Sequence, residues 1–142
     1  MSLPAEISGR ETPAGDGSAL DALIDFYRSF NASDLKALAA NWAEGEAPSM
    51  DNPIGGIRRG WPAIREGYAK LFGGPAIVRV AFHDFAAQGN NDYHLFVGRE
   101  KASAKLQRFG LNFEFARLDG SSRCVAFGGN SITMGLSKSR HC

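Results

Sequence analysis

The sequence predicts an α+β fold in which a strongly curved antiparallel sheet wraps, as a cone, around three N-terminal helices. In the first half of the chain apolar residues recur at helical spacing, interrupted by short polar or glycine-containing segments. After Pro75 the pattern changes to long alternating stretches separated by turn residues, which is typical of an antiparallel meander. Helices followed by such strands pack on one face of the sheet, and the open end of the cone can hold a small molecule.

Length and composition indicate a single domain with its own core. The chain has 142 residues, of which 44% are apolar, and a formal net charge of +1, all ordinary values for a soluble globular protein. Residues 1–17 are rich in Pro, Gly, Ser and acids without a period, so we expect a disordered leader. The folded domain then spans residues 18–136, and residues 137–142 form a polar tail.

Three helices are expected, each ended by turn residues. Ser18 and Asp21 form a capping pair that starts the first helix, and Asn31-Ala32-Ser33 ends it. Pro62 suits the first turn of the third helix, which Gly73-Gly74-Pro75 terminates. The apolar faces of the three helices consist of Leu20, Leu23, Ile24, Tyr27, Phe30, Leu35, Leu38, Trp42, Ile64, Tyr68, Leu71 and Phe72.

Four long strands are expected after Pro75, at residues 77–88, 93–104, 106–118 and 123–134. The segment Gly89–Asp92 predicts a hairpin between the first two, and Asp119-Gly120 predicts a turn between the last two. On the third strand the alternation places Phe113 on an aromatic face that packs against the helices.

A short braced segment, residues 49–62, places an acid and an amide directly before Pro53. If it is a strand, Met50 and Asn52 face the cone, where the Asn52 amide can bind a carbonyl or hydroxyl, while Asp51 faces outward. The alternative is that Asp51 caps a turn before the proline.

Asp84 and Arg99 are the charged residues that the alternation places on the inner face of the sheet. If Asn90-Asn91 is a two-residue turn, Phe82 lies opposite Arg99 and Asp84 lies diagonally from it. Burying either charge alone would cost several kcal/mol, so the two are expected to pair. The alternatives are a structural ion pair, or a bulge that turns one of them outward.

Several classes of function lack a signal in the sequence. No set of His, Cys, Asp or Glu has the spacing of a metal site, and no cofactor-binding motif is present. The balanced charge argues against a nucleic-acid partner, and no apolar run is long enough to span a membrane. Cys124 and Cys142 make no disulfide framework, so we expect free thiols and a cytoplasmic protein.

The run Asp51-Asn52-Pro53-Ile54-Gly55, followed by Gly60 and Ala63–Glu66, resembles that of ketosteroid isomerases. Residues 18 to about 134 resemble the nuclear transport factor 2-like superfamily, with its cystatin-like cone, and within it the SnoaL-like branch. The resemblance implies a pocket for a small hydrophobic ligand and a homodimer formed through the outer sheet face.

This sequence differs from ketosteroid isomerases at the positions of that family's catalytic residues. Asn52 stands where that family has its proton-shuttling acid, and Phe26, next to Tyr27, stands where it has a tyrosine. Limonene epoxide hydrolase has an arginine where Arg99 lies and a last-strand acid near Phe127. Isomerisation by the usual route is therefore not expected, because a proton shuttle needs an ionisable group.

The resulting hypothesis is a cofactor-independent isomerase, cyclase or lyase acting on a hydrophobic carbonyl compound. The alternatives are a non-catalytic, ligand-binding homodimer and an interaction module. The predicted catalytic residues are Asp84, Arg99 and Asp51. The predicted pocket residues are Asn52, Met50, Tyr27, Trp42, Tyr68, Phe113 and Phe127.

Overall fold

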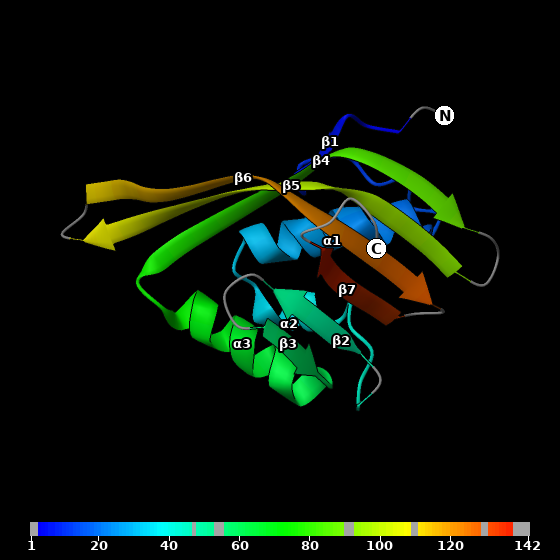
Figure 1. Cartoon of the computed structure of the whole chain (residues 1–142), viewed down its shortest axis with the longest axis horizontal. Helices are drawn as coiled ribbons and strands as arrows, with labels where there is room; N and C mark the ends of the chain where they lie inside the picture. Colours follow the sequence, from blue (N-terminus) through cyan, green and yellow to red (C-terminus); the bar gives the residue numbers. More distant parts are fainter. Residues whose placement is uncertain are drawn as a thin grey trace.

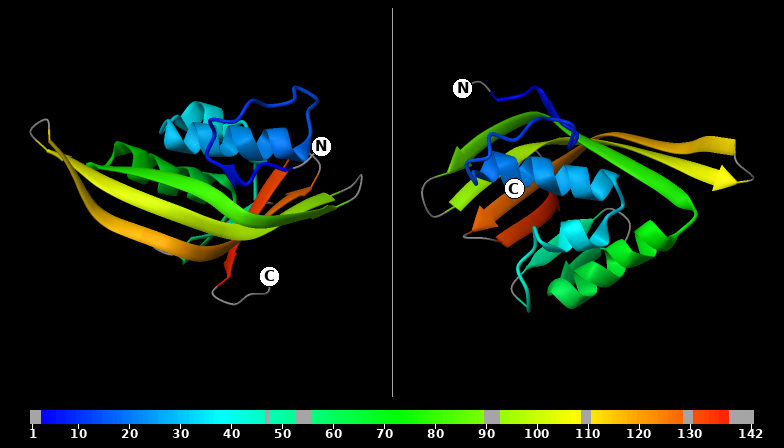
Figure 2. Two further views of the ribbon diagram at one scale, coloured as in Figure 1. Left: turned by 90° about the horizontal axis from the view of Figure 1, so that it is seen from above. Right: turned by 180° about the vertical axis from the view of Figure 1, so that it is seen from behind.

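In the computed structural model, the helices lie on one side of a curved sheet (Figures 1 and 2). The structure describes residues 3–46, 48–52, 56–89, 93–108, 111–128 and 131–137. Within these ranges, residues 51–52, 56, 93, 106–108, 111–128 and 131–137 are described by their backbone alone. The predicted α+β arrangement is confirmed, with the concave face of the sheet turned toward the helices.

The three helices are α1 (Ala19–Asn31), α2 (Leu35–Ala39) and α3 (Trp61–Gly73). The expected cap of α1 is present, because the Ser18 hydroxyl accepts a hydrogen bond of 3.2 Å from the backbone N–H of Asp21. Pro62 lies in the first turn of α3, as predicted. Helix α2 is shorter than its apolar pattern indicates and ends before Trp42. None of the helices within the described ranges is long and apolar enough to cross a membrane.

The strands form one sheet in the order β1-β4-β5-β6-β7-β2-β3. Neighbours are antiparallel except β2 and β7, which are parallel at the pair Met50 and Met134. The strand bounds are β1 Glu6–Ile7, β2 Ser49–Asn52, β3 Gly56–Arg59, β4 Ala76–Gly89, β5 Tyr93–Arg108, β6 Leu111–Gly128 and β7 Ser131–Ser137.

The expectation of a disordered leader is wrong for the segment that contains β1. Ile7 is fully buried and pairs with Phe82 of β4. Gly9 has a φ of +88° and lies so close to α1 that a Cβ would overlap the backbone of Arg28. The segment packs against the domain because Ile7 adds apolar area to the core. At position 9 only glycine fits this close to the helix.

The predicted turn at Asp119-Gly120 is also wrong, because both residues lie inside β6. Glu100 pairs with Ser121 and Lys101 pairs with Asp119, so Gly120 is an extra residue without a partner in β5. Asp-Gly is a strong turn signal, but glycine equally serves a β-bulge. Strands β5 and β6 consequently stay paired along their length as a long hairpin. This hairpin extends beyond the rest of the sheet in Figure 1.

An aromatic core packs between the helices and the concave face. Phe26 contacts Tyr27 edge-on at a centroid distance of 5.1 Å, and Tyr27 stacks on Phe82 at 5.8 Å. Trp42 and Tyr68 continue the cluster toward α3, at 6.1 Å from each other. The core therefore joins α1, α3 and β4 into one body.

Candidate functional site

The identity of the inward-facing residues of β5 is set by a β-bulge in β4. His83 pairs with Arg99, but the next pair is Ala86 with Val97, so two residues of β4 lie opposite Gly98 alone. One of these two, Asp84, has a φ of +47°, the left-handed conformation. Ahead of the bulge, Phe82 pairs with Glu100 and not with Arg99, so the predicted register is wrong by one residue.

This register places a carboxyl group in the interior. Glu100 is 7% exposed, and its Oε1 accepts a hydrogen bond of 2.7 Å from the hydroxyl of Tyr27, which is 1% exposed. Tyr27 comes from α1, so the bond connects the helical layer with the sheet. Buried charged or polar groups of this kind need such partners, and hydrogen bonds to them strengthen in a low dielectric.

With Arg99 predicted on the inner face, alternation along the strand predicts Glu100 on the outer face, and this prediction is wrong. A one-residue shift of register moves every side chain of a strand to the opposite face. The missed signal was the alternation of Phe96, Gly98 and Glu100, which places an aromatic ring, a residue without a side chain and an acid on one face. Phe85 packs over Gly98, because a Cβ on this glycine would lie 2.5 Å from the Cβ of Phe85.

Asp84 and Arg99 do pair, but not inside the cone. The Nε of Arg99 lies 3.4 Å from Oδ2 of Asp84, which confirms the predicted contact. Their side chains are 49% and 75% exposed, respectively, so the predicted inner-face position is wrong. The bulge considered as an alternative is present, and it leaves the pair at the surface, where it has no access to the interior.

Three predicted pocket residues, Met50, Trp42 and Tyr68, belong to the buried aromatic cluster together with Tyr27. Trp42 is stacked on Trp61 at a centroid distance of 6.2 Å. Its indole Nε1 is buried, and no described residue accepts a hydrogen bond from it. The ring of Tyr27 itself contacts those of Phe26 and Phe82.

The remaining predicted site residues have side chains outside the described ones. The backbone places Asp51 and Asn52 in β2, opposite Ile57 and Gly56 of β3. Phe113 and Phe127 lie in β6, opposite Leu106 and His94 of β5. Their roles remain predictions.

The described part of the chain contains no group of three or more His, Cys, Asp or Glu residues that could hold a metal ion. The polar groups described in the interior include the carboxyl group of Glu100, the hydroxyls of Tyr27 and Tyr68 and the indole N–H of Trp42, which lie among aromatic rings. Such a set can bind an apolar ligand and can exchange a proton with it.

Comparisons with solved structures identify the fold. A nuclear transport factor 2-like superfamily protein from Salmonella enterica matches with a TM-score of 0.59 at 13% identity, over 80% of this chain and 81% of that one. A ketosteroid isomerase-like protein from Erwinia carotovora gives a TM-score of 0.54 at 13% identity, over 83% and 92%.

A third similar structure is that of SalBIII, an epoxide hydrolase/cyclase-like enzyme with a role in pyran ring formation in the polyether salinomycin. It gives a TM-score of 0.50 at 13% identity, over 83% of this chain and 89% of that one. No protein-family model matches the sequence, and no curated protein matches it at a significant level.

The class of protein is thus a small α+β cone with a buried carboxyl–phenol pair between helix and sheet. The chain has the nuclear transport factor 2-like fold, as the resemblance of residues 18 to about 134 predicted. At these identities the likeness shows the fold alone, and function has to be argued from the site.

Proposed function

We propose that the protein binds a small hydrophobic carbonyl compound inside the cone and isomerises or cyclises it without a cofactor. The observation that carries this proposal is the 2.7 Å hydrogen bond between Tyr27 and Glu100, both buried among aromatic rings. The similar structures with cyclase-like and isomerase-like names have the same fold, which supports a ligand in the cone.

In this proposal Glu100 is the base. Its carboxylate removes a proton from the carbon next to the ligand's carbonyl and returns that proton at another carbon, so that no external reagent is consumed. Tyr27 orients the carboxyl through their hydrogen bond. Asp84 and Arg99, which the sequence favoured as catalytic residues, are exposed on the sheet and have no part in this step.

The test is a thermal-shift screen against ketones, polyketide-like aromatics and steroids, followed by mass spectrometry of every compound that stabilises the protein. With such a compound, Glu100→Gln should bind normally and lose turnover, because the amide keeps the shape of the carboxyl but cannot take up a proton. Arg99→Gln is the matched surface control and should turn over at the wild-type rate. Equal turnover by Glu100→Gln would refute the assignment of the base.

The second candidate function is a non-catalytic carrier of the same class of ligand. It is favoured by Asn52, an amide at the position where the resemblance implies a proton-shuttling acid. A carrier would return every stabilising compound unchanged in mass and retention time, and Glu100→Gln would alter its affinity alone.

We also propose a homodimer formed through the outer face of the sheet, as the resemblance implies. Light scattering at micromolar concentration should give twice the monomer mass of 15.3 kDa. A mass of one chain would exclude this assembly.

A further inference from the structure

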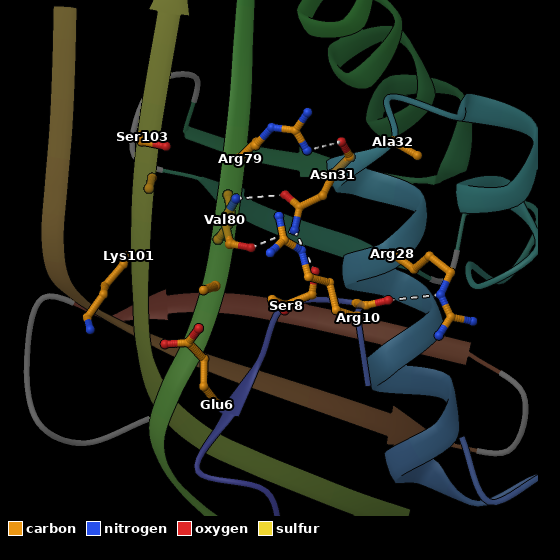
Figure 3. Close-up of a pocket in the computed structure, with 13 residues that line it drawn as sticks. Glu6, Ser8, Arg10, Arg28, Asn31, Ala32, Arg79, Val80, Lys101 and Ser103 are labelled. Atoms are coloured by element: carbon orange, nitrogen blue, oxygen red, sulfur yellow. Dashed lines mark hydrogen bonds between the residues drawn. The ribbon is translucent and has the colours of Figure 1, made fainter. Parts of the chain in front are cut away.

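A second site lies outside the cone, where the N-terminal segment leaves the sheet. Strand β1 covers only two residues of the edge of β4, and beyond it the chain turns toward α1. The space left there is a groove of about 670 Å³ (Figure 3), a volume within the usual range of small-molecule sites. Its lining comes from the N-terminal segment, from α1 and from strands β4 and β5.

Asn31 fixes the two walls of this groove against each other. Its amide nitrogen donates to the carbonyls of Ser8 and Val80, both at 2.8 Å. Its Oδ1 accepts from the N–H of Val80 at 2.7 Å. The side chain thus pairs with the edge of β4 as a neighbouring strand would, and it connects that edge to the N-terminal segment.

The charge of the groove differs from that of the chain as a whole. The sequence contains 16 basic and 15 acidic residues, whereas the groove is lined by four basic residues and one acid, Glu6. The basic residues come from three elements and from the N-terminal segment, so they are not a single run of sequence. They are Arg10, Arg28, Arg79 and Lys101.

Two of these cations are held in place by neutral groups. Arg28 donates from Nε to the carbonyl of Gly9 at 2.9 Å and from Nη2 to that of Glu11 at 2.8 Å. Arg79 donates to the carbonyl of Asn31 at 3.3 Å. Among the described residues, no carboxylate forms an ion pair with any of the four cations. Arg28 and Arg79 are thus positioned by neutral carbonyl groups, and neither forms an ion pair with a described carboxylate.

From this arrangement we propose that the groove binds a small organic anion through its phosphate or carboxylate groups. Guanidinium groups pair with both kinds of oxyanion through two parallel hydrogen bonds. Arg79 on β4 and Arg10 on the N-terminal segment both line the groove and contact the anion, while Arg28 adds to the local positive potential. The site is independent of the cone and of Glu100.

The experiment is isothermal titration calorimetry with inorganic pyrophosphate at constant ionic strength, using the full chain. The wild type should show saturable binding with one site per chain. Arg79→Gln and Arg10→Gln should each weaken binding by about tenfold. Arg65→Gln is the matched control, since it removes one exposed positive charge from α3, outside the groove, and should change affinity by less than about twofold.

If Arg79→Gln fails to fold, Arg10→Gln still tests the proposal, because within the described residues no hydrogen bond of the Arg10 side chain supports the fold. Absence of saturable binding, or equal weakening by Arg65→Gln, would overturn the proposal. So would binding of a single-stranded oligonucleotide in place of pyrophosphate, because the groove would then serve a nucleic acid. Glu100→Gln should bind pyrophosphate as the wild type does, whether or not the protein has activity in the cone.

Discussion

Two acids on neighbouring strands, Glu100 and Asp84, have opposite surroundings. Glu100 is 7% exposed and accepts a hydrogen bond from Tyr27 inside the aromatic core. The side chain of Asp84 is 75% exposed and pairs with Arg99 at the surface. The same chemical group is therefore available for interior chemistry in one place and is a solvated surface charge in the other.

The bulge at Asp84 produces this difference. With two residues of β4 opposite Gly98, both Phe82 and Phe85 lie against that glycine, and the ring stack of 5.1 Å between them covers it. The alternation of β5 then fixes Glu100 on the same face. Which acid lies inside thus depends on one residue of register and not on the acids themselves.

The largest expected effect comes from filling the gap at Gly98. A Cβ there would lie 2.5 Å from Cβ of Phe85 and 2.8 Å from Cζ of Phe82. Gly98→Val should lower the free energy of unfolding by about 3 kcal/mol, because the rings have to move out of a packed core. Urea denaturation measures the change.

The control for that substitution places the same side chain on the opposite face. Arg99→Val should change stability by no more than about 0.5 kcal/mol, since Arg99 is half exposed and valine suits a strand. If Gly98→Val were as stable as Arg99→Val, the assigned inner face of β5 would be wrong.

A pair of double-mutant cycles compares the two acids directly. Tyr27→Phe with Glu100→Leu should give a coupling energy of about 1–2 kcal/mol, because each substitution removes one partner of their buried hydrogen bond. Asp84→Asn with Arg99→Gln should give less than about 0.5 kcal/mol, because that pair is exposed to solvent. Similar couplings in the two cycles would remove the distinction between buried and exposed pairs.

The bulge itself can be tested through the backbone of Asp84. A β-branched residue is strained at a φ of +47°, so Asp84→Val should destabilise the protein by about 1–2 kcal/mol. Asp84→Asn is the control, because asparagine tolerates the left-handed region, and its stability should stay close to that of the wild type. Equal stability of the two variants would show that the bulge is not needed.

The helices and the hairpin of β4 and β5 could be predicted from the sequence because their signals are local. Ser18, Pro62 and the glycines after α3 each act within one turn of the residues that they cap or end. The burial of Met50 likewise followed from alternation within a short strand.

Register could not be predicted because it depends on irregularities that have no unique local signal. Asp119-Gly120 has the composition of a turn but lies at a bulge, and Asp84 shows no sign of one at all. Glu100 was therefore assigned to the wrong face. The attachment of residues 6–9 depends on α1 and β4, which are distant in sequence, so composition alone indicated a leader.

The smallest expected effect concerns a third acid, Glu66 on α3, which provides a reference for exposed pairs. Its hydrogen bond with Lys70 at 2.8 Å, and then the charge of Lys70, lower the pKa of Glu66 below its ordinary value of 4.5. Because the folded-state pKa is lowered, the pair stabilises the fold above that value and the contribution is lost as pH falls through the folded-state pKa. Lys70→Gln should raise the pKa of Glu66 toward 4.5 in an NMR titration, whereas Arg65→Gln should leave it unchanged. An unshifted pKa in Lys70→Gln would mean that exposed pairs in this protein have no measurable coupling.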